Sequence, residues 1–178
     1  MQLCDKSNSD TLMVENPKIS KISPIIHING NSGWATFKSE GNCTGEGTPS
    51  DPYLISDLHI DAGGSRGITI ENSDVFFKIR NCTIWNTGGS WYEGGINLFR
   101  VMNGIIENNT LYDNNHCGIQ LDNSDYNLIL NNTIDESGYG IFFYTNCSFN
   151  TISKNLIKNG GSAVSATSST NPPKNITI

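Results

Sequence analysis

Apolar and polar positions alternate in a unit that recurs along most of the chain, and the stretch Gly118–Ile134 shows the unit most clearly. Its first apolar run, Ile119–Leu121, is followed by a polar corner rich in Asn and Asp, and the second run, Leu128–Leu130, leads into Asn-Asn-Thr-Ile. Alternation with a period of two residues is typical of strands, whereas clusters of Asn, Asp and Ser are typical of turns. Each unit therefore predicts two or three short strands joined by tight corners.

The unit repeats at a nearly fixed interval. The glycine before the first apolar run recurs with spacings of 28, 23, 22 and 23 residues, at Gly67, Gly95, Gly118 and Gly140, with Ala163 in the fifth place. The long first interval contains an insertion, residues 88–93 (GGSWYE). A period near 23 residues is typical of a solenoid, in which each strand pairs with the same strand of the next coil, about 4.8 Å away. Leucine-rich repeats have a similar period, but Leu is scarce and neither side of the unit reads as a helix.

The pattern divides the chain into three parts. Residues 1–24 are polar and aperiodic, and we expect a flexible leader. Residues 25–52 form an expected N-terminal cap, in which Trp34 and Phe37 cover the open end of the repetitive core. Residues 53–178 contain the coils. Because the final residues resemble the start of another strand, we expect further coils or self-association at this C-terminal edge.

Composition supports strands and excludes two classes of partner. The chain has 24 Asn, 22 Ile and 18 Gly but four Ala, which disfavours helices. The net charge is −6 and no stripe of Lys and Arg is present, so no nucleic-acid partner is expected. No apolar run is long enough for a membrane span.

The second residue of each Asn-Asn pair falls at one position of the coil. This column contains Asn109, Asn132 and Asn155, with Cys82 in the preceding coil. Stacked Asn side chains can pass amide hydrogen bonds from coil to coil, with Cys82 as a small apolar filler at the end of such a ladder. The alternative is local: Asn occurs at corners because it tolerates the left-handed conformation.

Several segments carry a family resemblance. NCTGEGTPSDPYLI (residues 42–55), IENSDVFFKIRNCTI (70–84) and the units from 118 to 157 resemble NosD-like right-handed parallel β-helix proteins, a group also described as carbohydrate-binding proteins and sugar hydrolases (CASH type), including secreted archaeal members. The resemblance implies an all-β, right-handed parallel β-helix (solenoid) with about 22–23 residues per coil. The family includes sugar lyases, hydrolases, surface adhesins and proteins that assist copper-site assembly, and the fold does not select among them.

Outward side chains of the first strand are the candidate ligand-binding residues. One column holds Thr69, Asn97, Gln120 and Phe142, and its neighbour holds Glu71, Phe99, Asp122 and Tyr144. Aromatic rings beside amides and carboxylates suit sugars, because the ring face accepts C–H groups and the polar groups accept hydroxyls. The ligand-binding prediction covers Asn97, Phe99, Gln120, Asp122, Phe142 and Tyr144. The alternative is a solvated face with cross-strand aromatic pairs.

Catalysis has weaker candidates. Asp113 and Glu136 share one position on adjacent coils and could act on a glycosidic bond, although they could equally be corner residues repeated by the period. His27, His59 and His116 show no ligand spacing with Cys or Met, so we expect neither a metal site nor a cofactor. Disulfide pairing cannot be assigned from the five Cys.

The leading hypothesis is an extracellular or cell-surface β-helix module that binds polysaccharide or has a structural role. Six Asn-x-Ser/Thr sequons are compatible with secretion, at Asn42, Asn81, Asn108, Asn131, Asn146 and Asn175. The alternatives are a polysaccharide lyase or glycoside hydrolase, and an accessory protein for copper-site assembly.

Overall fold

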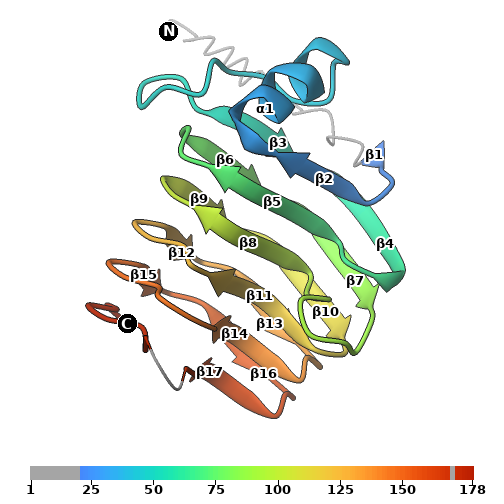
Figure 1. Ribbon diagram of the computed structural model, residues 1–178. Helices are drawn as coiled ribbons and strands as arrows, with labels where there is room; N and C mark the ends of the chain where they lie inside the picture. Colours follow the sequence, from blue (N-terminus) through green and yellow to red (C-terminus); the bar gives the residue numbers. More distant parts are fainter. Residues whose placement is uncertain (1–20, 169–170) are drawn as a thin grey trace, which may run out of the picture.

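The computed structural model describes residues 21–168 and 171–178 and shows a stack of coils built from three parallel sheets (Figure 1). Sheet A contains β1 (Lys21–Ile22), β4 (Leu58–Ser65), β7 (Thr83–Thr87), β10 (Thr110–Asn114), β13 (Thr133–Asp135) and β16 (Leu156–Lys158). Sheet B contains β2 (Ile26–Asn29), β5 (Ile68–Ser73), β8 (Ile96–Val101), β11 (Cys117–Asp122), β14 (Tyr139–Phe143) and β17 (Ser162–Ala166). Sheet C contains β3 (Tyr53–Ser56), β6 (Phe77–Arg80), β9 (Gly104–Glu107), β12 (Leu128–Leu130) and β15 (Thr151–Ser153).

The register between coils follows the predicted repeat, and the predicted solenoid fold is confirmed. In sheet C, Ile79 pairs with Ile106 and Ile106 pairs with Ile129, and all three side chains are fully buried. Sheet A aligns Ile84, Leu111, Ile134 and Ile157 in the same way. These columns form one continuous apolar core. Each buried Ile contributes about 1.5–3 kcal/mol to the stability of the fold.

The repeated glycine before sheet B is required by a close approach between coils. A Cβ on Gly118 would lie 2.9 Å from the carbonyl oxygen of Gly140 and 2.5 Å from Cγ2 of Ile134. Gly95 faces the carbonyl oxygen of Gly118 in the same manner, at 2.8 Å. The period of the glycine column therefore reports direct backbone contact between successive coils.

The abundance of Asn is explained by the corners between the sheets. Many corner residues have positive φ, between 45° and 61° in the four clearest columns, and Asn adopts this conformation more readily than other non-glycine residues. The columns contain Asp57, Asn81, Asn108, Asn131 and Lys154; Asn72, Arg100, Asn123 and Asn146; Asn86, Asp113, Glu136 and Asn159; and Asn103, Tyr126, Phe149 and Asn175.

The second residue of each Asn-Asn pair forms the ladder of hydrogen bonds. Asn109 Nδ2 donates to Asn132 Oδ1 at 3.0 Å, and Asn132 Nδ2 donates to Asn155 Oδ1 at 2.9 Å. The backbone N–H of Cys82 donates to Asn109 Oδ1 at 2.9 Å, which ends the column. The two explanations offered by the sequence thus apply to different residues: the first Asn of the pair takes the left-handed corner and the second builds the ladder.

A second ladder was not predicted. Asn127 Nδ2 donates to Asn150 Oδ1 at 3.1 Å, and Asn127 Oδ1 accepts from the backbone N–H of Gly104 at 2.9 Å. Both Asn side chains are buried. Two amide columns therefore connect the coils on either side of sheet C.

The N-terminal end of the stack carries the helix α1 (Gly30–Ser39), which the composition did not predict. Trp34 is fully buried and stacks on Tyr53, with ring centroids 5.2 Å apart and an interplanar angle of 1°. Phe37 packs against the core from the same helix. Because helices in proteins are stabilised mainly by packing of their apolar face, this contact outweighs the strand-favouring composition.

The N-terminal end of the described chain differs from the expected flexible leader, because part of it forms a strand. Lys21 and Ile22, within the expected leader, form a strand that pairs with β4, and residues 1–20 lie outside the described residues. At the other end, Thr177 bridges to Thr151 and Ile178 is 83% exposed. Further coils or self-association at this C-terminal edge stays a prediction.

Candidate saccharide site on sheet B

The insertion between β7 and β8 folds over the outward face of sheet B. We call residues 88–93 the roof loop. Trp91 of this loop contacts Phe142 and Tyr144, with ring centroids 6.1 and 5.5 Å apart. Tyr92 contacts Phe99 and Tyr144, at 6.4 and 6.1 Å. The long interval between Gly67 and Gly95 thus marks the segment that covers the predicted ligand face.

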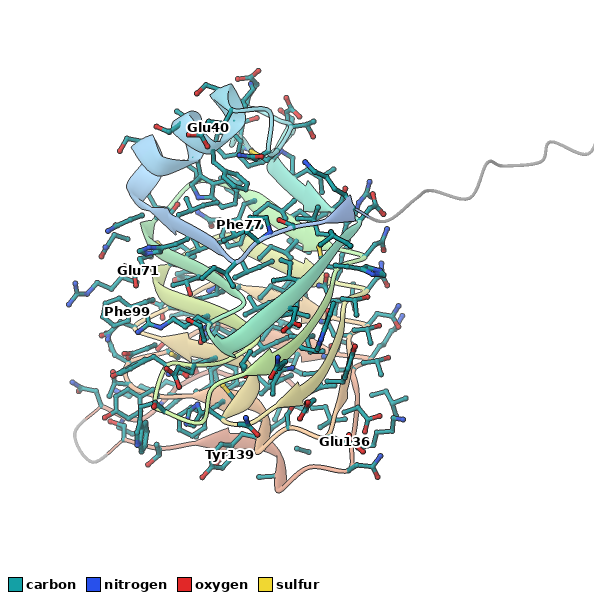
Figure 2. The ribbon with its side chains drawn as sticks, turned by 90° about the vertical axis from the view of Figure 1, so that its right-hand side faces the viewer. Glu40, Glu71, Phe77, Phe99, Glu136 and Tyr139 are labelled. Atoms are coloured by element: carbon teal, nitrogen blue, oxygen red, sulfur yellow. The ribbon has the colours of Figure 1, made fainter. Side chains whose placement is uncertain are left out.

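Beneath and beside the roof loop lies a pocket of about 270 Å³, which we call the sheet B pocket. It is lined by Arg66, Thr69, Glu71, Tyr92, Asn97, Leu98, Phe99, Gln120 and Asp122. Figure 2 shows Glu71 and Phe99 on one side of the stacked coils, with Glu136 on the other.

Four of the six predicted ligand residues line the pocket, namely Asn97, Phe99, Gln120 and Asp122. The other two, Phe142 and Tyr144, contact Trp91 of the roof loop. The sequence interpretation did not include Arg66 and Tyr92, which also line the pocket. The available signal for Tyr92 was its place in the insertion, because the solenoid repeat itself assigns no position to that loop.

Several outward side chains are more buried than a solvated sheet face would be. Asn97, Gln120 and Asp122 are 5%, 1% and 3% exposed. Asn97 is held at the end of the roof loop: its Oδ1 accepts from Gly94 N at 3.0 Å and its Nδ2 donates to Gly94 O at 2.8 Å. The C-terminal end of the roof loop is therefore anchored to the sheet.

Two buried polar groups in the pocket lack a partner among the described residues. These are the Nε2 group of Gln120 and the hydroxyl of Thr69, which is 4% exposed. Burying a polar group without a hydrogen bond costs about 1–3 kcal/mol. A bound molecule with hydroxyl oxygens would provide the missing partners for both groups.

The charged groups of the pocket are arranged in two environments. Glu71 pairs with Arg66 at 3.7 Å and lies 3.3 Å from His27 Nε2. Asp122 instead accepts hydrogen bonds from Thr145 Oγ1 at 2.5 Å and Asn123 Nδ2 at 2.9 Å.

The pocket also shifts the pKa of Tyr92. Burial raises the pKa of Tyr92, and the charge of Asp122 adds to that effect. The phenol is therefore protonated at neutral pH and available for hydrogen bonding.

Next to the pocket, His116 lies in an aromatic cluster below Trp91. Its ring centroid is 5.6 Å from those of Trp91 and Phe142. Burial lowers the pKa of His116, whereas Glu93 and a hydrogen bond with Gln120 oppose that shift. The Cys117 thiol also approaches Gln120, with Sγ 3.6 Å from Oε1.

His116 lies in the bend before β11, where the alternation of a regular strand does not apply.

The carboxylates proposed as catalytic candidates lie at corners. Asp113, near the end of β10, and Glu136, directly after β13, occupy equivalent positions, because Tyr112 pairs with Asp135. Both are exposed, with φ of 52° and 49°. This position matches the corner interpretation that the sequence left open beside the catalytic one.

The described residues contain free thiols but no cluster of metal ligands. Among the described residues, no group of three or more His, Cys, Asp or Glu side chains could hold a metal ion. Cys43, Cys82, Cys117 and Cys147 are buried free thiols. Burial raises the pKa of Cys82 to about 11 and that of Cys147 to about 12.

Parallel strands stacked coil upon coil around one apolar core define the class of parallel β-solenoids. The family model described as "Right handed beta helix region" matches residues 3–178, and the chain belongs to that right-handed β-helix family. Comparison with curated proteins and with solved structures found no match. Over the described residues, the single helix is too short and too polar to cross a membrane.

Proposed function

We propose that the chain is a saccharide-binding β-helix module whose binding site is the sheet B pocket. The observation that carries this proposal is a roofed pocket that combines aromatic rings with buried polar groups lacking a partner. Its volume of about 270 Å³ is near the lower limit for small-molecule sites, a size suited to one sugar unit of a chain.

The lining groups supply the contacts that a sugar needs. The rings of Phe99 and Tyr92 offer apolar faces for the C–H groups of a pyranose. Gln120 Nε2 donates to a sugar hydroxyl oxygen, and the Thr69 hydroxyl donates or accepts. The carboxylates of Glu71 and Asp122 accept from sugar hydroxyl groups.

An extracellular or cell-surface location is part of the same proposal. The sequon residues Asn42 and Asn146 are exposed, which supports their modification in a secreted chain. Intact mass before and after glycosidase treatment of the secreted protein would test this, and an unmodified chain from a secreting eukaryotic host would contradict it. The NosD-like and archaeal assignments remain predictions from the sequence resemblance.

Lyase or hydrolase activity is the second candidate, and copper-site assembly ranks below it. A carboxylate pair on adjacent coils, Asp113 and Glu136, motivates the catalytic candidate. Both side chains are exposed at left-handed corners, so we favour binding over turnover. Reducing-sugar and unsaturated-product assays decide between them, and turnover that is lost in Asp113→Ala or Glu136→Ala would overturn our preference.

The binding proposal is tested with an immobilised glycan panel followed by calorimetry on the best ligands. Phe99→Ala removes a ring from the pocket, and we expect at least a tenfold loss of affinity because stacking of one aromatic ring is lost. Phe149→Ala is the matched control, because Phe149 is an exposed ring that stacks on Tyr126 at a corner.

Thermal unfolding of both variants checks that the fold is kept. Equal affinity of Phe99→Ala and the unmodified protein would contradict the proposed site, and the absence of any glycan ligand would contradict the proposed function.

A further inference from the structure

Asp122 is a buried carboxylate in the sheet B pocket that has no cationic partner. Its exposure is 3%, and among the described residues no Lys, Arg or His forms an ion pair with it. Glu71, in the same pocket, differs because Arg66 and His27 both lie beside it. Buried charges in proteins are normally paired, and a cationic ligand would supply the partner that Asp122 lacks.

The hydrogen bonds of Asp122 leave one oxygen for such a ligand. Thr145 Oγ1 and Asn123 Nδ2 both donate to Oδ1, and Thr145 N adds a longer bond of 3.4 Å to the same atom. Within the described part of the chain, every hydrogen bond to this carboxylate falls on Oδ1. These donors fix the orientation of the carboxylate.

The net charge of the pocket also points to a cation. Arg66 and Glu71 both line the pocket and pair with each other at 3.7 Å, so their charges largely cancel. The charge of Asp122 remains. The rings of Tyr92 and Phe99 line the same pocket, and aromatic faces attract cations. One face of Phe99 already holds the guanidinium of Arg100, 4.7 Å from the ring centroid.

We propose that the sheet B pocket takes a sugar unit with a free amine, a hexosamine, whose ammonium group pairs with Asp122. The inference rests on the proposed saccharide-binding function and adds the class of sugar. The buried, unpartnered Gln120 Nε2 and Thr69 hydroxyl bind hydroxyl oxygens of the same unit, which a simple amine would not provide. A uronate is rejected, because its carboxylate would lie close to that of Asp122.

The test compares oligosaccharides of matched length by calorimetry at low ionic strength: glucosamine, N-acetylglucosamine and galacturonate oligomers. We expect the glucosamine oligomer to bind about tenfold or more tightly than its N-acetylated counterpart, as one additional charge-assisted hydrogen bond predicts. The galacturonate oligomer should bind least. Added salt should lower the ratio of the two affinities, because it screens the ion pair between the amine and Asp122 in this partly open site.

Two variants assign the preference to Asp122. Asp122→Asn keeps the size of the side chain but removes its charge, so the affinity ratio of amine to acetylated oligomer should fall towards one. Asp125→Asn is the matched control: Asp125 also accepts a hydrogen bond from the next coil, at Ser148 N, but it does not line the pocket. The ratio should stay unchanged in this control, and thermal unfolding reports whether either variant folds.

The outcomes separate the inference from the function on which it rests. Binding of neutral or galacturonate oligomers as tightly as glucosamine oligomers would overturn the hexosamine assignment but keep saccharide binding. A linear polyamine that matches the glucosamine oligomer in affinity would show a cation site without sugar recognition and would also overturn it. If Asp122→Asn does not fold, the oligosaccharide ranking and its salt dependence on the unmodified protein still decide the matter.

Discussion

The substitution Asn132→Ala tests whether the Asn ladder holds the coils together. Asn132 is 1% exposed, and its side chain makes four hydrogen bonds. Its Oδ1 accepts from both the backbone and the side-chain nitrogen of Asn109 at 3.0 Å. Its Nδ2 donates to Ile106 O and Asn155 Oδ1 at 2.9 Å.

The cost follows from the groups that lose their partner. Asn109 Nδ2 still bonds to Ile79 O, and Asn155 Oδ1 still accepts from the backbone N–H of residue 132. The Asn109 backbone N–H and the Ile106 carbonyl lose the bonds that this side chain provides. At about 1–3 kcal/mol for each of these two buried groups, the free energy of unfolding should fall by about 2–6 kcal/mol. That is a large share of the roughly 5–15 kcal/mol that stabilises a typical domain.

The measurement is equilibrium urea unfolding followed by circular dichroism and by tryptophan fluorescence, because solenoids can unfold in more than one step. Asn131→Gly is the control: Asn131 is the neighbouring residue, is exposed and has a φ of 54°, which glycine adopts freely. We expect this control to stay within about 0.5 kcal/mol of the unmodified protein.

Asn132→Asp gives a sharper comparison. It keeps the shape and the accepting oxygen but loses both donors, so it should also destabilise the fold, and acidification should restore part of the loss as the carboxyl protonates. A free energy of unfolding for Asn132→Ala within about 0.5 kcal/mol of the unmodified protein would refute the argument.

Three further predictions concern the end of the stack, the contact between coils and the aromatic cluster. Trp34→Ala should cost about 3–5 kcal/mol in urea unfolding, because it empties the fully buried site that stacks on Tyr53, and a loss below 1 kcal/mol would contradict that. Gly118→Ala should cost about 1–3 kcal/mol by overpacking against Ile134, and an unchanged unfolding midpoint would show that the coils can separate freely. His116 should titrate by NMR with a pKa below its ordinary value of 6.5, because burial disfavours its charged form, and Trp91→Ala should raise that pKa by uncovering the ring. The neutral, buried His116 should therefore give full stability above pH 6.5, and the free energy of unfolding should decline as the pH falls below 6.5, because the unfolded chain binds the proton more readily. A pKa of His116 at or above 6.5 would contradict this.

Much of the fold could be predicted from the sequence because a solenoid repeats its contacts. Ile106 and Ile129 pair directly, and the same spacing in the sequence brings their neighbours into register as well. The Asn ladder followed from the same argument, since Asn109 and Asn132 fall at one position of the coil. The second ladder, at Asn127 and Asn150, also joins residues 23 positions apart, but neither residue belongs to an Asn-Asn pair, so the pair pattern did not predict it.

The candidate site was predicted only in part. The outward residues Asn97, Gln120 and Asp122 were placed on the correct face by strand alternation. Their burial was not predicted, because it depends on a loop that lies outside the repeat and has no partner at a fixed spacing. Arg66 was not predicted either, because it lies just before β5, where strand alternation does not set the direction of its side chain.

By itself the sequence determined the stacked coils, their register and the residues of the outward face, because each of these repeats with a constant spacing and involves neighbours in adjacent coils. Only the tertiary structure decided that the insertion at residues 88–93 folds back over sheet B and turns an open sheet face into a pocket. The path of that loop depends on contacts of Trp91 and Tyr92 with rings on other coils, and no local pattern in the chain encodes them.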